Sequence, residues 1–250
     1  MTSYIIIPAR LASTRLPRKL LLRETGKTVL QHTYEAAREA RHPLGVCVAA
    51  DHEEIVAEVR AFGGQVYMTS PDHPCGTDRI AECARLLPRA EILVNVQGDE
   101  PELAGEAIDQ VIELLESDPD AVMATLATPI RSREKLLDPS CVKVVCDARG
   151  RAIYFSRSPI PHAREWDDSL LSATPAPFLQ HIGLYAYRRD FLMEFTQWPQ
   201  GRLEQIEKLE QLRVIEAGRA IQVGLVESAT RGIDTLADYE AFVERMLQLT

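Results

Sequence analysis

The chain has 250 residues, 46% of them hydrophobic, and a formal net charge of −9 at pH 7. That length favours one α/β domain over two small ones, and the apolar content supplies a substantial core. The acidic balance argues against general binding to nucleic acid or anionic membranes. No run of 18 apolar residues and no signal-peptide pattern occurs, so neither a transmembrane helix nor secretion is expected.

Short apolar runs alternate with amphipathic stretches over the first half of the chain. We expect strands at residues 4–7, 46–50, 66–68, 92–96 and 121–127, and helices at 30–40, 53–62, 77–87 and 106–116. This alternation predicts a mostly parallel sheet with helices on both faces. Such sheets bind ligands at the carboxyl ends of their strands.

The pattern changes after about residue 130. We expect a hairpin from strands 142–146 and 152–155, a polar stretch at 158–177, a strand at 182–187, a helix at 203–217, a strand at 221–226 and a helix at 236–249. We interpret residues 1–250 as a single domain. One part of it spans 1–129 with 226–250, and an additional lobe spans 130–225.

Five cysteines are present, and none form a CxxC pair: Cys47, Cys75, Cys83, Cys141 and Cys146. Their odd number fits unpaired thiols in a reducing compartment better than a disulfide framework or a zinc site. The cytoplasm is therefore the expected location.

The loop after the first strand gathers four cations in the sequence PARLASTRLPRK, residues 8–19. They are Arg10, Arg15, Arg18 and Lys19. A cationic loop at a strand end of an acidic protein favours a small polyanion, with a nucleoside triphosphate as the obvious candidate. The loop lacks both GxxxxGK[ST] and GxGxxG. The alternative is a solvated basic loop.

Two aspartates follow later strands and are candidate ligands for Mg²⁺, which prefers one or two carboxylates plus phosphate oxygens. Asp99 lies in NVQGDEP, residues 95–101, where an acidic turn is the alternative. Asp234 lies in GIDT, residues 232–235, where it could instead cap the last helix in competition with Thr235.

Polar residues elsewhere allow both functional and structural interpretations. Gly76 begins a helix and would leave amides free for an anion, or the helix is simply capped by Thr77. Arg157 suits a substrate carboxylate. His181 fits a hydrogen-bonded structural residue, and Glu204, one turn from Glu207, fits a solvated helix face.

Eight motifs, in order along nearly the whole chain, resemble the 3-deoxy-manno-octulosonate cytidylyltransferases, also called CMP-Kdo synthetases. They are PARLASTRLPRK, PCGTDR, VNVQGDEP, VKVV, YFSRSPIP, QHIGLYAYR, LEQIEKLEQLR and GIDT. The resemblance implies a Rossmann-like nucleotide-diphospho-sugar transferase fold, α/β in class, in which residues 1–129 with 226–250 bind the nucleotide and the additional lobe binds the sugar. It also implies a homodimer formed through that lobe. It implies Mg²⁺ as cofactor and CTP and Kdo as substrates, with CMP-Kdo for lipopolysaccharide biosynthesis and pyrophosphate as products.

The same resemblance implies the site residues. Catalytic roles fall to Arg10, Arg15, Lys19, Asp99 and Asp234, of which Asp99 and Asp234 hold the metal. The nucleotide-binding residues are Pro8, Ala9, Arg10, Arg15, Lys19, Cys75, Gly76, Thr77, Arg79, Gln97, Gly98 and Asp99. The sugar-binding residues are Gln97, Arg157, His181, Tyr185, Glu204 and Gln205. The chain departs from the family at Cys75, usually serine, and at Arg18, often glycine.

The implied reaction is in-line attack of the anomeric hydroxyl of Kdo on the α-phosphorus of CTP. Such chemistry needs positioning and charge neutralisation more than a covalent nucleophile, and no residue is assigned as general base. One alternative is a cytidylyltransferase for another α-keto acid sugar, such as sialic acid or an amino variant of Kdo. Others are a sugar-1-phosphate nucleotidyltransferase and a catalytically dead sugar-nucleotide sensor.

Overall fold

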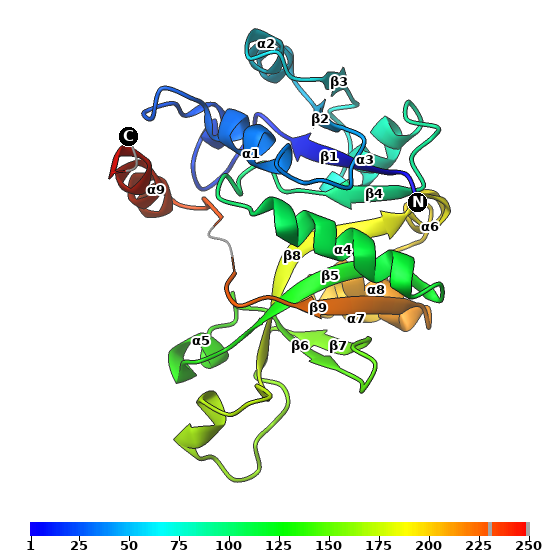
Figure 1. Ribbon diagram of the computed structural model, residues 1–250, viewed down its shortest axis with the longest axis vertical. Helices are drawn as coiled ribbons and strands as arrows, with labels where there is room; N and C mark the ends of the chain where they lie inside the picture. Colours follow the sequence, from blue (N-terminus) through cyan, green and yellow to red (C-terminus); the bar gives the residue numbers. More distant parts are fainter. Residues whose placement is uncertain (230–231, 249–250) are drawn as a thin grey trace. The chain divides into compact units, whose positions relative to one another are not determined.

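The computed structural model describes residues 1–229 and 232–248, and the chain folds into two compact units (Figure 1). The first contains Met1–Ile112 and the C-terminal segment, and the second is Glu113–Ala229. Strand β5 (Ala121–Pro129) lies in the second unit because it pairs with strands of that unit. The assignment of nucleotide and sugar binding to separate parts of the chain stays a prediction.

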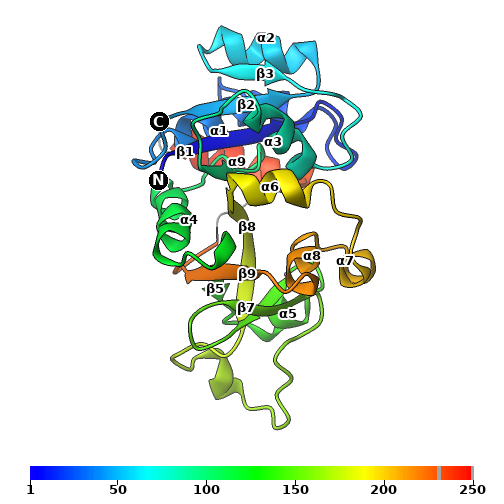
Figure 2. The ribbon, with the colours of Figure 1, turned by 90° about the vertical axis from the view of Figure 1, so that its right-hand side faces the viewer.

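The first unit contains four parallel strands in the order β3-β2-β1-β4. Their bounds are β1 (Ser3–Ala9), β2 (Val46–Ala50), β3 (Val66–Met68) and β4 (Ile92–Asn95). The residues of β2 and β4 are buried throughout, as expected for parallel strands covered on both faces. All four carboxyl ends therefore share one edge, and β3 lies at the end of the row beside α2 (Figure 2).

Helices of the first unit confirm the expected alternation. They are α1 (Val29–Ala37), α2 (Glu53–Ala61), α3 (Gly76–Ala84) and α9 (Leu236–Gln248), with the 3₁₀ turn η1 (Lys19–Leu21). Helix α4 (Gly105–Ser117) begins in this unit and ends in the second. With right-handed crossovers, the strand order puts α1 and α2 on one face of the sheet and α3 on the other. The expected last residue of the final helix, Leu249, lies outside the described residues.

The second unit is built around β5, which pairs antiparallel with β8 (Leu179–Arg188) and parallel with β9 (Ala220–Leu225). The expected hairpin is confirmed as β6 (Lys143–Cys146) and β7 (Ala152–Ser156), and β6 also pairs with β8. Its turn reaches back to β9, where the amide of Val223 donates to the carbonyl of Gly150 at 2.9 Å. Gly150 has φ +77°, a backbone conformation that favours glycine.

The expected single helix at 203–217 is wrong, because two helices occupy this stretch. They are α7 (Arg202–Glu207) and α8 (Gln211–Glu216), separated by Lys208 in a left-handed conformation with φ 54°. The carbonyl of Glu207 accepts from Nε of Arg157 at 2.8 Å. In a continuous helix this carbonyl would accept from a backbone amide of the next turn instead.

Three short elements of this unit were not predicted: α5 (Arg133–Leu137), η2 (Asp168–Leu171) and α6 (Arg189–Phe195). Each has too few turns to give a clear helical period. The stretch 158–177 is polar in composition but buries part of Trp166 and Leu170 against a small core that includes Ile130 and Phe178. None of the helices at 1–229 and 232–248 is long and apolar enough to span a membrane.

Candidate active site

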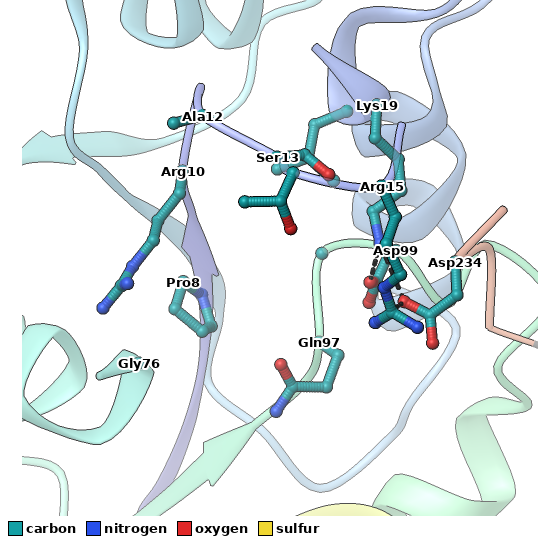
Figure 3. Close-up of a pocket in the computed structure, with 13 residues that line it drawn as sticks. Pro8, Arg10, Ala12, Ser13, Arg15, Lys19, Gly76, Gln97, Asp99 and Asp234 are labelled. Carbon is teal, nitrogen blue, oxygen red and sulfur yellow. Dashed lines mark hydrogen bonds and ion pairs between the residues drawn. The ribbon is translucent and has the colours of Figure 1, made fainter. Parts of the chain in front are cut away.

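The carboxyl ends of β1 and β4, the start of α3 and the segment before α9 surround a cavity of about 320 Å³ (Figure 3). Its size is at the lower end of the range for small-molecule sites. It is lined by Pro8, Arg10, Ala12, Ser13, Thr14, Arg15, Lys19, Leu20, Gly76, Gln97, Gly98, Asp99 and Asp234. All belong to the first unit, and they include all five residues expected to be catalytic.

Gly98 allows the two strand ends to approach closely. A Cβ built there would lie 3.3 Å from the carbonyl oxygen of Pro8 and 3.4 Å from the side chain of Leu20. The carbonyl of Gly98 also accepts from the Thr33 hydroxyl at 3.0 Å, which ties this turn to α1. The turn that carries Asp99 is therefore fixed against both neighbouring elements.

Lys19 joins the two candidate metal ligands. Its Nζ lies 2.5 Å from Oδ2 of Asp99 and 3.3 Å from Oδ1 of Asp234. The Lys19 side chain is only 11% exposed, whereas those of Asp99 and Asp234 are 27% and 49% exposed. Arg15 donates to the same Oδ1 of Asp234 at 2.8 Å from a side chain that is 65% exposed. Two cations and two carboxylates thus form one charge-balanced group.

Asp234 does not cap the last helix, which settles one alternative left open by the sequence. The Thr235 hydroxyl accepts from the amide of Asp238, whose carboxylate accepts in return from the amide of Thr235. This reciprocal capping box satisfies the helix start. The amide of Ile233 also donates to the carbonyl of Asp99 at 2.9 Å. The Asp234 carboxylate therefore does not cap the helix, and the backbone next to it is held beside Asp99.

The donor set fits a magnesium ion. Two carboxylates converge on one point, the Lys19 ammonium, and Mg²⁺ is commonly held by one or two carboxylates together with phosphate oxygens and water. No group of three or more His, Cys, Asp or Glu side chains that could hold a metal occurs among residues 1–229 and 232–248.

Three of the four cations in the first loop line the cavity, namely Arg10, Arg15 and Lys19. Arg10 lies across the cavity from Lys19, and its Nη2 donates to the carbonyl of His73 at 2.9 Å (Figure 3). Arg18 is not among the lining residues and pairs instead with Glu54 on α2. It has φ 55°, so a glycine would fit this position without strain.

Of the residues expected at the start of α3, only Gly76 lines the cavity. Cys75 directs its Sγ to Oδ2 of Asp78 at 3.0 Å, and Thr77 is 5% exposed. The side chain of Arg79 is completely buried, and burial lowers its pKa. Nucleotide contacts from these three residues stay predictions.

His181 in the second unit is buried, which lowers its pKa to about 3. Its Nε2 lies 3.0 Å from the Thr125 hydroxyl, which also lies 2.9 Å from the carbonyls of Ile182 and Leu184. Tyr185 lies beside His181, with ring centroids 5.4 Å apart. His181 is buried in this unit, and Tyr185 is half-buried.

The expected solvated face of α7 is wrong for Glu204, which is 5% exposed. Its carboxylate accepts from Nε and Nη2 of Arg213, both at 2.7 Å, and this ion pair links α7 to α8. Gln205 is exposed and donates to the carbonyl of Gln200 at 3.1 Å. The sugar-binding roles of both residues stay predictions, but the Glu204 carboxylate already has a strong partner.

A family model described as cytidylyltransferase matches residues 4–221. A 3-deoxy-manno-octulosonate cytidylyltransferase of Rhodopirellula baltica is 55% identical over 98% of this chain and 99% of its own length. One from Geobacter sulfurreducens is 48% identical over 98% of this chain and 100% of its own. This chain belongs to the 3-deoxy-manno-octulosonate cytidylyltransferase family.

Solved structures agree with the fold of this cytidylyltransferase. A CMP:2-keto-3-deoxy-manno-octonic acid synthetase complexed with CTP is 41% identical, with a TM-score of 0.92 and full coverage of both chains. A cytidylyltransferase of Leptospira borgpetersenii, 14% identical, has a TM-score of 0.61 over 100% of this chain and 93% of its own, and shares the fold. The expected nucleotide-sugar transferase fold is confirmed.

The structure adds polar residues of the cytidylyltransferase that sequence reasoning missed. Nε2 of Gln211 and Oε1 of Gln180 are buried and have no hydrogen-bond partner within the described ranges. Arg157 is held by Glu207, whose carboxylate accepts from the Arg157 amide at 3.0 Å, and by Lys143, whose Nζ donates to the Arg157 carbonyl at 2.6 Å. The sequence does place Gln211 close to the apolar Leu209 and Leu212, and this could have indicated that the Gln211 side chain is buried.

Proposed function

We propose that this protein transfers CMP from CTP to the anomeric hydroxyl of Kdo, which yields CMP-Kdo for lipopolysaccharide biosynthesis and releases pyrophosphate. The observation that carries the proposal is the cavity in which Arg10, Arg15 and Lys19 face Asp99 and Asp234, in a chain of this family. A solved relative named for CMP-Kdo synthesis is complexed with CTP, which supports the choice of nucleotide.

The first unit supplies the groups that a triphosphate requires. Arg10 and Arg15 would bind phosphate oxygens and stabilise the charge that develops on the leaving pyrophosphate. The Kdo hydroxyl oxygen forms a bond to the α-phosphorus, the bond from that phosphorus to the bridging oxygen breaks, and the hydroxyl proton leaves to solvent. We assign no side chain as the base.

We further propose that Asp99 and Asp234 hold Mg²⁺. When bound, the ion supplies positive charge to phosphate oxygens and to the attacking hydroxyl. Binding would displace the Lys19 ammonium from between the two carboxylates and free it for a phosphate oxygen. Lys19 is largely buried and is well placed for this exchange because it already contacts both aspartates.

For the sugar, we propose contacts from Gln97, Arg157, His181 and Tyr185. Arg157 is the cation suited to the carboxylate of an α-keto acid sugar, and its backbone is held on both sides by side chains. We also propose a homodimer, by family resemblance, and a cytoplasmic location, which the five free cysteines support.

Pyrophosphate release from CTP, UTP, ATP and GTP with Kdo, followed with and without Mg²⁺, tests the proposal. We expect release with CTP and Kdo only, and only with the metal. Parallel reactions with CTP and sialic acid, amino-Kdo or a sugar 1-phosphate test the alternatives. Faster release with any of these sugars than with Kdo would replace the proposed substrate.

A further inference from the structure

Asp51, at the carboxyl end of β2, brackets Arg10 on both sides along the backbone. Its amide donates to the carbonyl of Ala9 at 3.2 Å, and its Oδ1 accepts from the amide of Leu11 at 2.9 Å. The Asp51 side chain is 14% exposed. The loop therefore leaves β1 in a direction fixed by this carboxylate, and Arg10 is the residue between the two bonds.

The same carboxylate faces the buried guanidinium of Arg79. Oδ2 of Asp51 lies 3.9 Å from Nη2 of Arg79, whose side chain has no exposed surface. Nε and Nη2 of Arg79 have no hydrogen-bond partner in the described part of the chain. A buried cation without an opposite charge is strongly destabilising, and Asp51 supplies more of that opposite charge to Arg79 than Glu82 does.

Arg79 in turn fixes the loop that holds the Arg10 guanidinium. Nη1 of Arg79 donates to Oγ1 of Thr69 at 2.5 Å and to the carbonyl of Ser70 at 3.0 Å. The same loop continues to His73, whose carbonyl accepts from Nη2 of Arg10. Asp51 thus reaches Arg10 by two routes, directly through its backbone and indirectly through Arg79 and this loop.

We propose that Asp51 is a positioning residue for triphosphate binding, which acts by setting the orientation of Arg10. The proposal deepens the proposed function and rests on it, because it takes Arg10 as a phosphate ligand. It requires both properties of the Asp51 carboxylate, an acceptor for the Leu11 amide and a negative charge for Arg79. Asparagine would preserve the first property and lose the second.

A double-mutant cycle read by calorimetric CTP binding, without sugar, tests the proposal. We expect Asp51→Ala to weaken CTP binding about 10- to 100-fold, since a small misplacement of a binding group has effects of that order. In the Arg10→Ala background the same change should cost less than about 2-fold, because the residue it positions is gone. Asp51→Asn should lie between the wild type and Asp51→Ala.

Asp109→Asn is the matched control. Asp109 is also largely buried in the first unit and accepts two backbone amides, those of Arg41 and His42, both at 2.9 Å, but it does not line the cavity. This variant should lower the melting temperature while CTP affinity stays unchanged. If Asp51→Ala is insoluble, the cycle is run with Asp51→Asn.

The positioning role would be overturned if Asp51→Ala lowered CTP affinity by the same factor in the wild type and in Arg10→Ala. It would also be overturned if Arg10→Ala alone left CTP affinity unchanged. Turnover is scored separately. A wild-type protein that binds CTP but releases no pyrophosphate with Kdo overturns the proposed function and leaves the cycle readable. Failure of the wild type to bind CTP overturns both.

Discussion

Lys19→Met removes the ammonium that lies between Asp99 and Asp234, and it should make the stability of the protein depend on Mg²⁺. Because Nζ is 2.5 Å from one carboxylate oxygen and 3.3 Å from the other, those oxygens lie within about 6 Å of each other. At that distance two negative charges repel by ~0.7 kcal/mol in water and by ~3 kcal/mol at an effective dielectric constant of 20.

The partial exposure of both carboxylates places the expected loss between these limits, at about 1–2 kcal/mol. For a chain of this size, that lowers the melting temperature by ~2–8 °C. A divalent cation bound between the carboxylates would cancel the repulsion, so saturating Mg²⁺ should restore most of the loss. Turnover should remain ~10²–10³-fold below the wild type, because the proposed phosphate contact of Lys19 is also lost.

Thermal melts in EDTA and in Mg²⁺ make the measurement, with Lys19→Arg as the charge-retaining control. Adding Asp234→Asn to Lys19→Met should remove both the repulsion and the response to the metal. A Lys19→Met protein that melts at the wild-type temperature in EDTA and does not respond to Mg²⁺ would refute the reasoning, since the two carboxylates would then not share a cation site.

Three further predictions follow from the described contacts. Arg18→Gly relieves the strain of a left-handed backbone, about 1 kcal/mol, and loses an exposed ion pair with Glu54 that is worth less than that. Urea melts should therefore show equal or greater stability. KM for CTP should not change. His181, with a pKa of about 3 when folded and about 6.5 when unfolded, takes up its proton only on unfolding between these values. Stability should therefore fall by about 2 kcal/mol from pH 7 to pH 5 through this residue, the loss should shrink in His181→Gln, and the NMR shifts of His181 should not titrate from pH 8 to 5. Arg213→Met leaves Glu204 buried without its partner and should lower the free energy of unfolding by ~3–5 kcal/mol, part of which Glu204→Gln added to it restores; no recovery would contradict the ion-pair account.

Regular parallel strands were predictable because burial on both faces forces continuous apolar runs. The sequence of β2, VCVAA, is such a run, and its bounds at 46–50 matched the expectation. The break between α7 and α8 was not predictable, because the pattern from Leu203 to Ala217 keeps a helical period. At the break, the Glu207 carbonyl accepts a hydrogen bond from Arg157, a residue about fifty positions away. Local periodicity carries no information about such distant partners.

The candidate site was likewise predictable from the sequence only in part. Sequence pattern placed Arg10 and Asp99 at one sheet edge, because both follow parallel strands and carboxyl ends meet there. It could not separate Arg18 from Lys19, since neighbouring residues in a loop point in directions that only the backbone conformation decides. Nor could it find Asp51, whose importance comes from a buried arginine on another element.

Lys19 and Asp234 meet across 215 positions of the chain. The cationic loop is synthesised early and Asp234 near the end. A chain interrupted before Gly232 would therefore contain the cationic loop and Asp99 but not Asp234. Contacts of such long sequence separation form late, because closing a long loop is entropically unfavourable. During translation, the charge-balanced group of Arg15, Lys19, Asp99 and Asp234 should therefore be completed only when the C-terminal segment has been made.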